Sequence, residues 1–180
     1  MAESEPNGSF FNAIDEWELG LCLFFNSGCH RTWIRQFFSA VSWLGNGIFW
    51  YVLAASLPVV YGFQAIPVFL HMLGVGVFNV LLYTLLKKRL GRHRPFVNHR
   101  EIHIGTAPLD WYSFPSGHTL HAVSFTIVVM AYFPVLGLVL IPFSVLIALS
   151  RLVLGLHYPS DVLAGSCIGA MVAFCSFLFL

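Results

Sequence analysis

Five long runs of apolar residues occupy most of this chain after its first 45 residues. They lie at 47–63, 65–86, 118–133, 136–150 and 160–180. A helix needs about 20 apolar residues to cross the hydrocarbon core of a bilayer, and shorter runs are sufficient at the margin. Charged residues make up 9% of the 180 residues, whereas soluble domains carry about 25%. We therefore predict an all-α fold, a multi-pass transmembrane helical bundle with about five spanning helices.

The segment before these runs has a different pattern. The stretch 17–26 is too short to span a membrane. Within 32–44, apolar side chains recur every three or four residues, and Arg31 and Arg35 lie toward the start. This spacing is typical of an amphipathic helix in the membrane interface, although an ordinary packed helix has the same spacing. We expect an N-terminal tail and interfacial amphipathic helix over 1–45 and a membrane-embedded domain over 46–180.

The charged residues all fall at one end of the predicted bundle. If the five runs cross the membrane, one face receives every basic residue: Arg31, Arg35, Lys87, Lys88, Arg89, Arg92, Arg94, Arg100 and Arg151. The same face receives every acidic residue: Glu3, Glu5, Asp15, Glu16, Glu18, Glu101, Asp110 and Asp161. The turns at the other face are short and uncharged. This distribution predicts an active site at a single membrane face.

Three basic residues on that face can bind a phosphate group. Lys87 and Arg94 follow the second run, and Arg151 follows the fourth. Arg presents a planar fork that matches phosphate oxygens, and Lys acts as a point charge. Ser116 and Gly117 lead into the third run, where the free N–H groups of a helix start bind anions and glycine allows a close backbone approach. These five residues predict a phosphate cage.

Two histidines and one carboxylate add reactivity to this cage. His157 and Asp161 are four residues apart, so on a helix they share one face. The acid can then fix the tautomer of the imidazole and leave the other ring nitrogen free to attack. Histidine can act as a nucleophile through a covalent intermediate. His118, at the start of the third run, can protonate a departing alkoxide and later activate water.

Taken together, the clusters resemble the signature of the type 2 phosphatidic acid phosphatase superfamily. Its three parts are matched by Lys87 with Arg94-Pro95, by Pro115-Ser116-Gly117-His118, and by Ser150-Arg151 with His157 and Asp161. The resemblance implies that His157 is the nucleophile, Asp161 its partner and His118 the general acid. It implies that the phosphate is bound, without metal or cofactor, by Lys87, Arg94, Ser116, Gly117 and Arg151. The 46–180 part is then a phosphatase domain of the short, five-span bacterial type.

This resemblance and the apolar composition lead us to expect a membrane phosphatase that acts on a lipid phosphate through a phosphohistidine. Phosphatidic acid, phosphatidylglycerophosphate and polyprenyl diphosphates are candidate substrates. A lipid phosphotransferase and a lipid A phosphatase use the same site and stay open. We expect substrate and membrane lipids as partners, and the formal net charge of +1 gives no reason to expect nucleic acid. We place the protein in the cell (inner) membrane, with its active site on the periplasmic or extracellular face.

Other polar residues have less specific interpretations. We expect interfacial anchors or contacts to lipid headgroups from Lys88, Arg89 and Arg92. His71, inside the second run, is expected to be a hydrogen-bonded core residue. Glu101 and Asp110, in the loop that follows Pro95, either shape the headgroup pocket or are solvated. The histidines lack neighbouring Asp, Glu or Cys at ligand spacing, so no metal site is expected.

Overall fold

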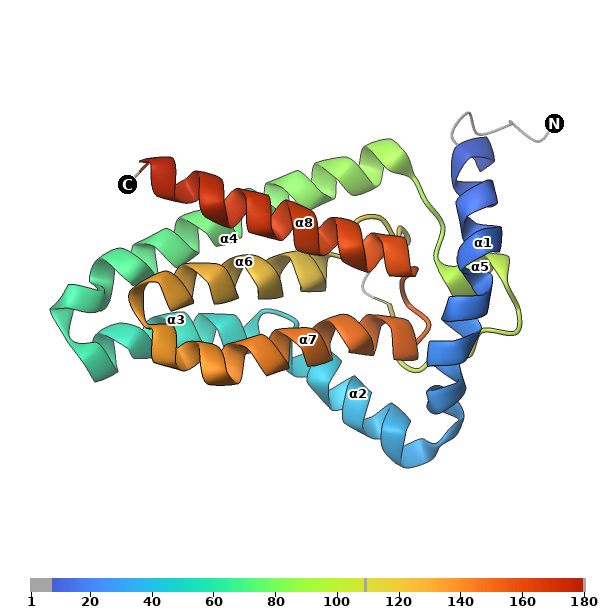
Figure 1. Cartoon of the computed structure of the whole chain (residues 1–180), viewed down its shortest axis with the longest axis horizontal. Helices are drawn as coiled ribbons and strands as arrows, with labels where there is room; N and C mark the ends of the chain where they lie inside the picture. The colour runs from blue at the N-terminus through green and yellow to red at the C-terminus, as the bar shows by residue number, and fades with distance from the viewer. Residues whose placement is uncertain (1–7, 109, 180) are drawn as a thin grey trace.

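The computed structural model of the chain describes residues 8–108 and 110–179, and helices make up most of it (Figure 1). The α-helices are α1 Gly8–Asn26, α2 Thr32–Leu44, α3 Ile48–Tyr61, α4 Ile66–Leu90, α5 Pro95–Asn98, α6 Gly117–Tyr132, α7 Gly137–Val153 and α8 Pro159–Ser176. Short 3-10 turns join or end them at Ser27–His30, Phe63–Ala65, Pro134–Leu136 and Phe177–Phe179. The predicted all-α bundle is confirmed.

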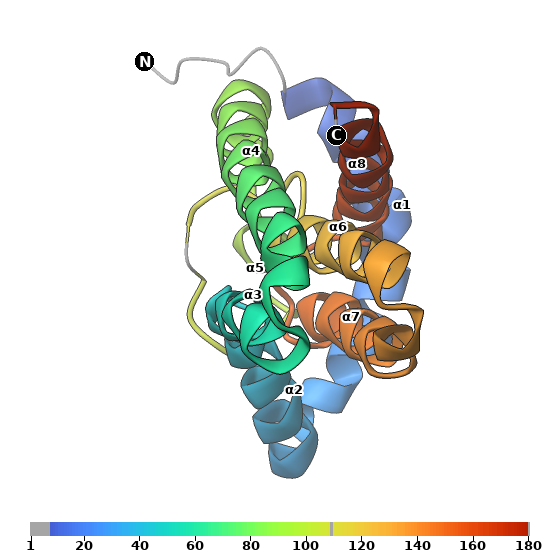
Figure 2. The same ribbon diagram turned by 90° about the vertical axis from the view of Figure 1, so that its left-hand side faces the viewer.

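Helix α6 forms the centre of this bundle. It packs against α4, α7 and α8, while α3 packs against α4 and α2 against α7 (Figure 2). Its side chains Leu120, Ala122, Val128 and Val129 are fully buried. Large apolar side chains on the outer helices are exposed instead, among them Val59 of α3, Leu138 of α7 and Met171 of α8. An outer surface of this kind is suited to contact with lipid chains.

All five predicted apolar helices form, but not all meet the length of a membrane span. Helices covering Phe63–Leu90, Pro134–Val153 and Pro159–Phe179 are long and apolar enough to cross a bilayer. The pair α2 and α3 counts as a fourth span only if the two are taken together across their 50° bend. At 16 residues, α6 extends about 24 Å, less than a bilayer core of about 30 Å. The structure thus supports three to four spans and not the expected five.

Two glycines allow α8 to approach α6 closely. A Cβ on Gly165 would lie 2.6 Å from the carbonyl oxygen of Ser116, and one on Gly169 would collide with the carbonyl oxygen of Leu120. The glycines are four residues apart, so they lie on one face of α8, in the small-xxx-small pattern of packed membrane helices. This contact fixes the start of α8 beside the start of α6.

Helix α1 was not expected from the sequence. Three acidic residues, Asp15, Glu16 and Glu18, interrupt its apolar pattern, yet it runs for 19 residues. It lies beside α5 at the end of the bundle away from the α3–α4 turn (Figure 1). Asp15 and Glu18 are each 3% exposed, so α1 turns two carboxylates toward the interior of the protein. Their partners lie next to the candidate site.

Candidate active site

A cavity of about 520 Å³ lies at the end of the bundle that carries the charged residues. Six of the residues predicted to form the site line it: Lys87, Arg94, Gly117, His118, Arg151 and His157. The structure thus brings these six residues together around one cavity. They come from the ends of the three helices α4, α6 and α7 and from the segments just before α5 and α8, so distant parts of the chain meet there.

Each side chain is placed by a helix end. Lys87 lies in the last turn of α4 and Arg151 in the last turn of α7, where positive charge is favourable beside the free carbonyl groups. Arg94 directly precedes α5, and His118 lies in the first turn of α6. His157 stands two residues before α8 begins at Pro159. His157 therefore lies outside helix α8, and it does not share a helix face with Asp161 as the spacing of four residues suggested. The bend of the chain before α8 brings the two side chains together instead.

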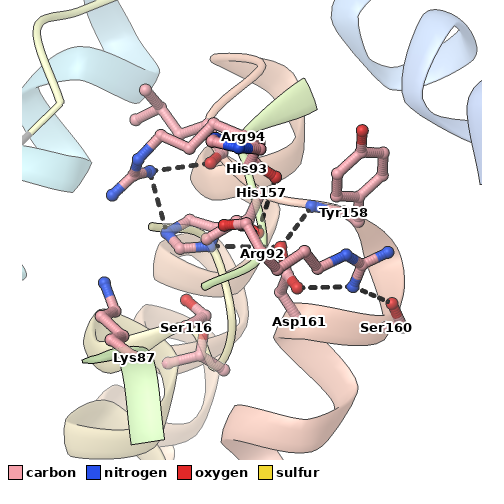
Figure 3. A network of polar contacts seen from close by, with 12 residues as sticks. Lys87, Arg92, His93, Arg94, Ser116, His157, Tyr158, Ser160 and Asp161 are labelled. Carbon is pink, nitrogen blue, oxygen red and sulfur yellow. Dashed lines mark hydrogen bonds and ion pairs between the residues drawn. The ribbon is translucent and has the colours of Figure 1, made fainter. Parts of the chain in front are cut away.

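The ring of His157 is held between an arginine and a carboxylate (Figure 3). Arg94 Nη1 lies 3.3 Å from His157 Nε2, and Asp161 Oδ2 lies 3.5 Å from His157 Nδ1. A guanidinium can only donate, so Nε2 must offer its lone pair, and the ring proton is then on Nδ1, facing Asp161. This tautomer points the unprotonated nitrogen toward the cavity and its cations.

Electrostatics keep this ring neutral. Burial lowers the pKa of His157 well below the ordinary 6.5, and the positive charges of Arg94, Arg151 and Lys87 lower it further. A neutral imidazole is the nucleophilic form. The neighbouring cations therefore favour the neutral form of His157.

Asp110 places a carboxylate inside the cage. Lys87 Nζ donates to Asp110 Oδ2 and Arg94 Nη2 donates to Asp110 Oδ1, both at 2.7 Å. Arg94 Nε also donates to the Asp110 carbonyl oxygen at 2.9 Å. Of the two interpretations left open by the sequence, this pairing with two cage cations favours a carboxylate that shapes the pocket, with a side chain that stays 39% exposed. The sequence could not predict the place of Asp110 in the cage, because the loop around it has neither a helical periodicity nor a known motif.

Arg151 is buried and contacts α2. It is 3% exposed, and its Nη1 donates to Ser42 Oγ of α2. Among the described residues, no hydrogen-bond partner faces its Nε atom. A buried guanidinium N–H without a partner costs free energy unless an anion satisfies it. The geometry is that of a site that binds an anion. Ser42 had not been singled out in the sequence.

Two of the predicted residues lie behind the cavity wall. Ser116 is fully buried, and its Oγ pairs with Thr119 Oγ1 at 2.9 Å. Its backbone N–H donates to the carbonyl oxygen of Asp161 at 3.1 Å. Neither Ser116 nor Asp161 is among the described residues that line the cavity. The structure thus places Ser116 between α6 and α8, with its hydroxyl hydrogen-bonded to Thr119 of α6.

The position of Arg92 differs from the one expected from the sequence. It was expected to anchor the protein at the lipid interface, but it is 2% exposed. Its guanidinium donates to carboxylates of Asp15, Glu18 and Asp161. The partners lie up to 77 positions away in sequence, so no local pattern could indicate them.

The remaining histidines have roles outside the chemistry. His71 is hydrogen-bonded to Tyr132 Oη at 3.2 Å and to Ser176 Oγ at 2.7 Å, which confirms the expected core role. His121 lines the cavity, and its Nδ1 lies 3.1 Å from the Gly117 carbonyl oxygen. Within residues 8–108 and 110–179, no group of three or more His, Cys, Asp or Glu side chains is arranged to hold a metal ion.

The fold and this site define a multi-pass membrane protein with a cationic cage around a histidine. The chain belongs to the PAP2 superfamily, whose family model matches residues 67–180. That range contains every residue of the cage. It leaves out α1 and α2, which supply Asp15, Glu18 and Ser42 to the surroundings of the site.

Known proteins resemble the chain in sequence and in fold. A lipid A 1-phosphatase of Rhizobium johnstonii is 37% identical over 98 residues, 52% of this chain and 40% of that protein. A decaprenylphosphoryl-5-phosphoribose phosphatase of Mycobacterium tuberculosis is 39% identical over 104 residues, 55% and 54% of the two chains. The chain therefore matches about half the length of these relatives. In fold it is similar to a transmembrane PAP2 type phosphatidylglycerolphosphate phosphatase from Bacillus subtilis, with a TM-score of 0.71, 23% identity and 94% and 85% of the chains covered.

Proposed function

We propose that this protein is a phosphatase of membrane lipid phosphates, with His157 as its nucleophile. The observation that carries the proposal is the placement of the His157 ring, which lines the cationic cavity with its Nε2 at 3.3 Å from Arg94 Nη1. A phosphate monoester carries about −1.5 to −2 charges at neutral pH. Lys87, Arg94 and Arg151 are sufficient to neutralise it.

In the first step, Nε2 of His157 attacks phosphorus. The N–P bond forms as the bond between phosphorus and the lipid oxygen breaks. His118, which enters this step as the protonated imidazolium, donates a proton to that oxygen so that an alcohol leaves. Asp161, whose Oδ2 lies 3.5 Å from Nδ1, stabilises the positive charge that the ring acquires. The three cations hold the equatorial oxygens and balance their charge in the transition state.

In the second step, water attacks the phosphohistidine. His118, now unprotonated, takes a proton from the water, whose oxygen bonds to phosphorus as the N–P bond breaks. Inorganic phosphate leaves and the neutral His157 is restored. If a lipid hydroxyl replaces the water, the same site performs phosphotransfer, so release of inorganic phosphate is the measurement that separates the two reactions.

An apolar groove beside the cage supports a lipid substrate. It has a volume of about 360 Å³ and lies between α3 and α4, with Trp50, Met72 and Leu73 in its wall. Tyr51 and Phe125 line both the groove and the catalytic cavity, so the two spaces adjoin. A substrate with a phosphate head and an apolar chain fits this arrangement. Lipid A, phosphatidic acid, phosphatidylglycerophosphate and prenyl diphosphates all have that form.

The test is phosphate release from these lipids in detergent by the wild-type protein and His157→Ala. We expect the substitution to lower kcat by about 10⁴-fold or more, since removal of a nucleophile abolishes the covalent route. His30→Ala is the matched control, because His30 is exposed and far from the cage in sequence and contacts. Folded His157→Ala protein that keeps more than about a tenth of wild-type turnover would overturn the proposal.

A further inference from the structure

A buried charge cluster lies on the side of Asp161 that faces away from the cavity. Its centre is Arg92, between α4 and α5, whose side chain is 1% exposed. Arg92 Nη1 donates to Asp161 Oδ1 and to Ser160 Oγ, both at 2.7 Å. Arg92 Nε and Nη2 donate to Asp15 Oδ1 at 3.0 and 2.7 Å, and Nη2 also donates to Glu18 Oε2 at 3.0 Å. One guanidinium thus holds three carboxylates.

The contacts of Asp161 show what this cluster controls. Its Oδ2 accepts the backbone N–H of Tyr158 at 2.8 Å and lies 3.5 Å from His157 Nδ1. Its Oδ1 is held by Arg92 (Figure 3). A carboxylate fixed at both oxygens cannot rotate, so Arg92 determines where Oδ2 lies relative to the imidazole. Arg92 also supplies the positive charge that a fully buried Asp161 needs to stay ionised.

Helix α1 in turn holds Arg92 in place. Glu18 Oε1 accepts the backbone N–H of Ser160, in the first turn of α8, and Glu18 Oε2 accepts the Ser160 hydroxyl, both at 2.7 Å. Asp15 Oδ2 accepts Asn98 Nδ2 of α5 at 3.1 Å. The guanidinium carbon of Arg92 lies 4.2 Å from the centre of the Tyr158 ring. Helix α1 therefore contacts both α5, through Asn98, and the start of α8, through Ser160.

We propose that Arg92, held by Asp15 and Glu18 of α1, is a positioning residue for the His157–Asp161 pair, and that α1 is part of the active-site apparatus. The inference rests on the proposed roles of His157 and Asp161. Arg92 is not among the described residues that line the cavity. It acts through the carboxylate and not on the substrate, so its loss should affect kcat and leave KM unchanged.

A double-mutant cycle tests this coupling. We expect Arg92→Gln to lower kcat on an aryl phosphate by about 10- to 100-fold, less than the roughly 10⁴-fold loss when a catalytic triad's orienting carboxylate is replaced. KM should stay within about twofold. In an Asp161→Asn background, Arg92→Gln should reduce kcat by less than about threefold, because the group through which it acts has lost its charge. An equal loss of kcat in both backgrounds would overturn the proposal.

A second measurement follows the His157 ring directly and does not depend on enzyme turnover. In protein labelled with ¹⁵N-histidine, Asp161→Asn should change the ring nitrogen signals of His157, and Arg92→Gln should change the same signals in the same direction. A His157 signal that Arg92→Gln leaves unaltered would contradict the inference. If the wild-type protein releases no phosphate from any lipid but the His157 signal responds, the proposed function fails and the positioning role stands.

A matched pair of variants tests the contribution of α1 to activity. Glu18 is buried and Glu16, two residues earlier on the same helix, is exposed. We expect Glu18→Gln to lower kcat about fivefold and, because it removes one charge of a buried ion pair, to lower the unfolding temperature. Glu16→Gln should change neither. Should Arg92→Gln fail to fold, Arg92→Lys replaces it, since Lys keeps the charge but loses the planar fork. Equal kcat for Glu16→Gln and Glu18→Gln would show that α1 has no such role.

Discussion

At the scale of single residues, we expect Asp110 to compete with the substrate for the cage. Its carboxylate occupies the space between Lys87 and Arg94 that a phosphate group needs. Burial acts to raise the pKa of Asp110, but the hydrogen bonds and charges of Lys87 and Arg94 outweigh burial and lower the pKa below its ordinary 3.8. Asp110 is therefore ionised at neutral pH, and substrate must displace it.

Removing that charge should strengthen anion binding. We expect Asp110→Asn to lower the inhibition constant of inorganic phosphate by about three- to tenfold, because partly exposed ion pairs contribute up to about 1 kcal/mol each. The side chain of Asp110 is 39% exposed, so a larger effect is not expected. Glu101→Gln is the control, since Glu101 lies exposed in the same loop. Weaker phosphate binding in Asp110→Asn would instead show that Asp110 helps to hold the substrate.

The titration of His157 is a second residue-level prediction. Its pKa is lowered by burial and by Arg94, Arg151 and Lys87, so in the free enzyme the ring should take up a proton only well below pH 6.5. The unfolded chain protonates this ring near pH 6.5, so its contribution to stability is complete above that pH and declines as the pH falls. Titration of the His157 ¹⁵N signals measures the midpoint. A midpoint at or above 6.5 would contradict the proposed electrostatics.

Some residues of the site could be predicted from the sequence and others could not. Lys87, Arg94, His118, Arg151 and His157 were found because phosphate chemistry restricts the residue types, and their order matches one signature. The partners of Arg92 could not be found this way. Asp15 and Asp161 are 77 and 69 positions from it, and only the three-dimensional packing of α1 against α8 brings them together.

At the scale of helices, the α6–α8 contact controls the geometry of the site. Ala at Gly165 would place its Cβ 2.6 Å from the Ser116 carbonyl oxygen, at the start of α6. We expect Gly165→Ala to destabilise the protein by about 1–3 kcal/mol, the usual cost of overpacking, and to lower kcat by shifting α8. Thermal unfolding in detergent measures the first effect and phosphate release the second.

Gly74 of α4 provides the control for that substitution. No neighbouring atom lies within 4 Å of a Cβ built there. Gly74→Ala should therefore leave activity unchanged and, because Ala favours a helix, should not destabilise the protein. If Gly165→Ala unfolds at the same temperature as Gly74→Ala, close packing of α8 on α6 does not limit stability.

Helix prediction succeeded where one physical signal dominated. The long apolar runs predicted α3, α4, α6, α7 and α8 to within a few residues, because no other structure suits such runs. Helix α1 was missed since its acidic residues look incompatible with an apolar environment. Those acids are neutralised by Arg92, and a single sequence does not reveal a partner so distant. The orientation of α2 in the membrane interface stays a prediction.

At the scale of the whole molecule, the basic residues give little information on orientation. The positive-inside rule applies to Lys and Arg that are free to contact headgroups. Lys87, Arg92, Arg94 and Arg151 are buried in and around the site, so their positions follow from chemistry and not from topology. The resemblance to bacterial lipid phosphatases favours a site on the periplasmic or extracellular side, and this orientation stays a prediction.

Two introduced cysteines decide the orientation. Ala107 is exposed in the segment between α5 and α6, and Gln64 is exposed in the α3–α4 turn. That turn lies at the end of the bundle opposite α5 (Figure 1). In a background without the four native cysteines, we expect Ala107→Cys to react with an impermeant maleimide in intact cells. Gln64→Cys should react only after the cells are opened. The reverse pattern would place the cage in the cytoplasm, and the substrate would then be a lipid of the cytoplasmic leaflet.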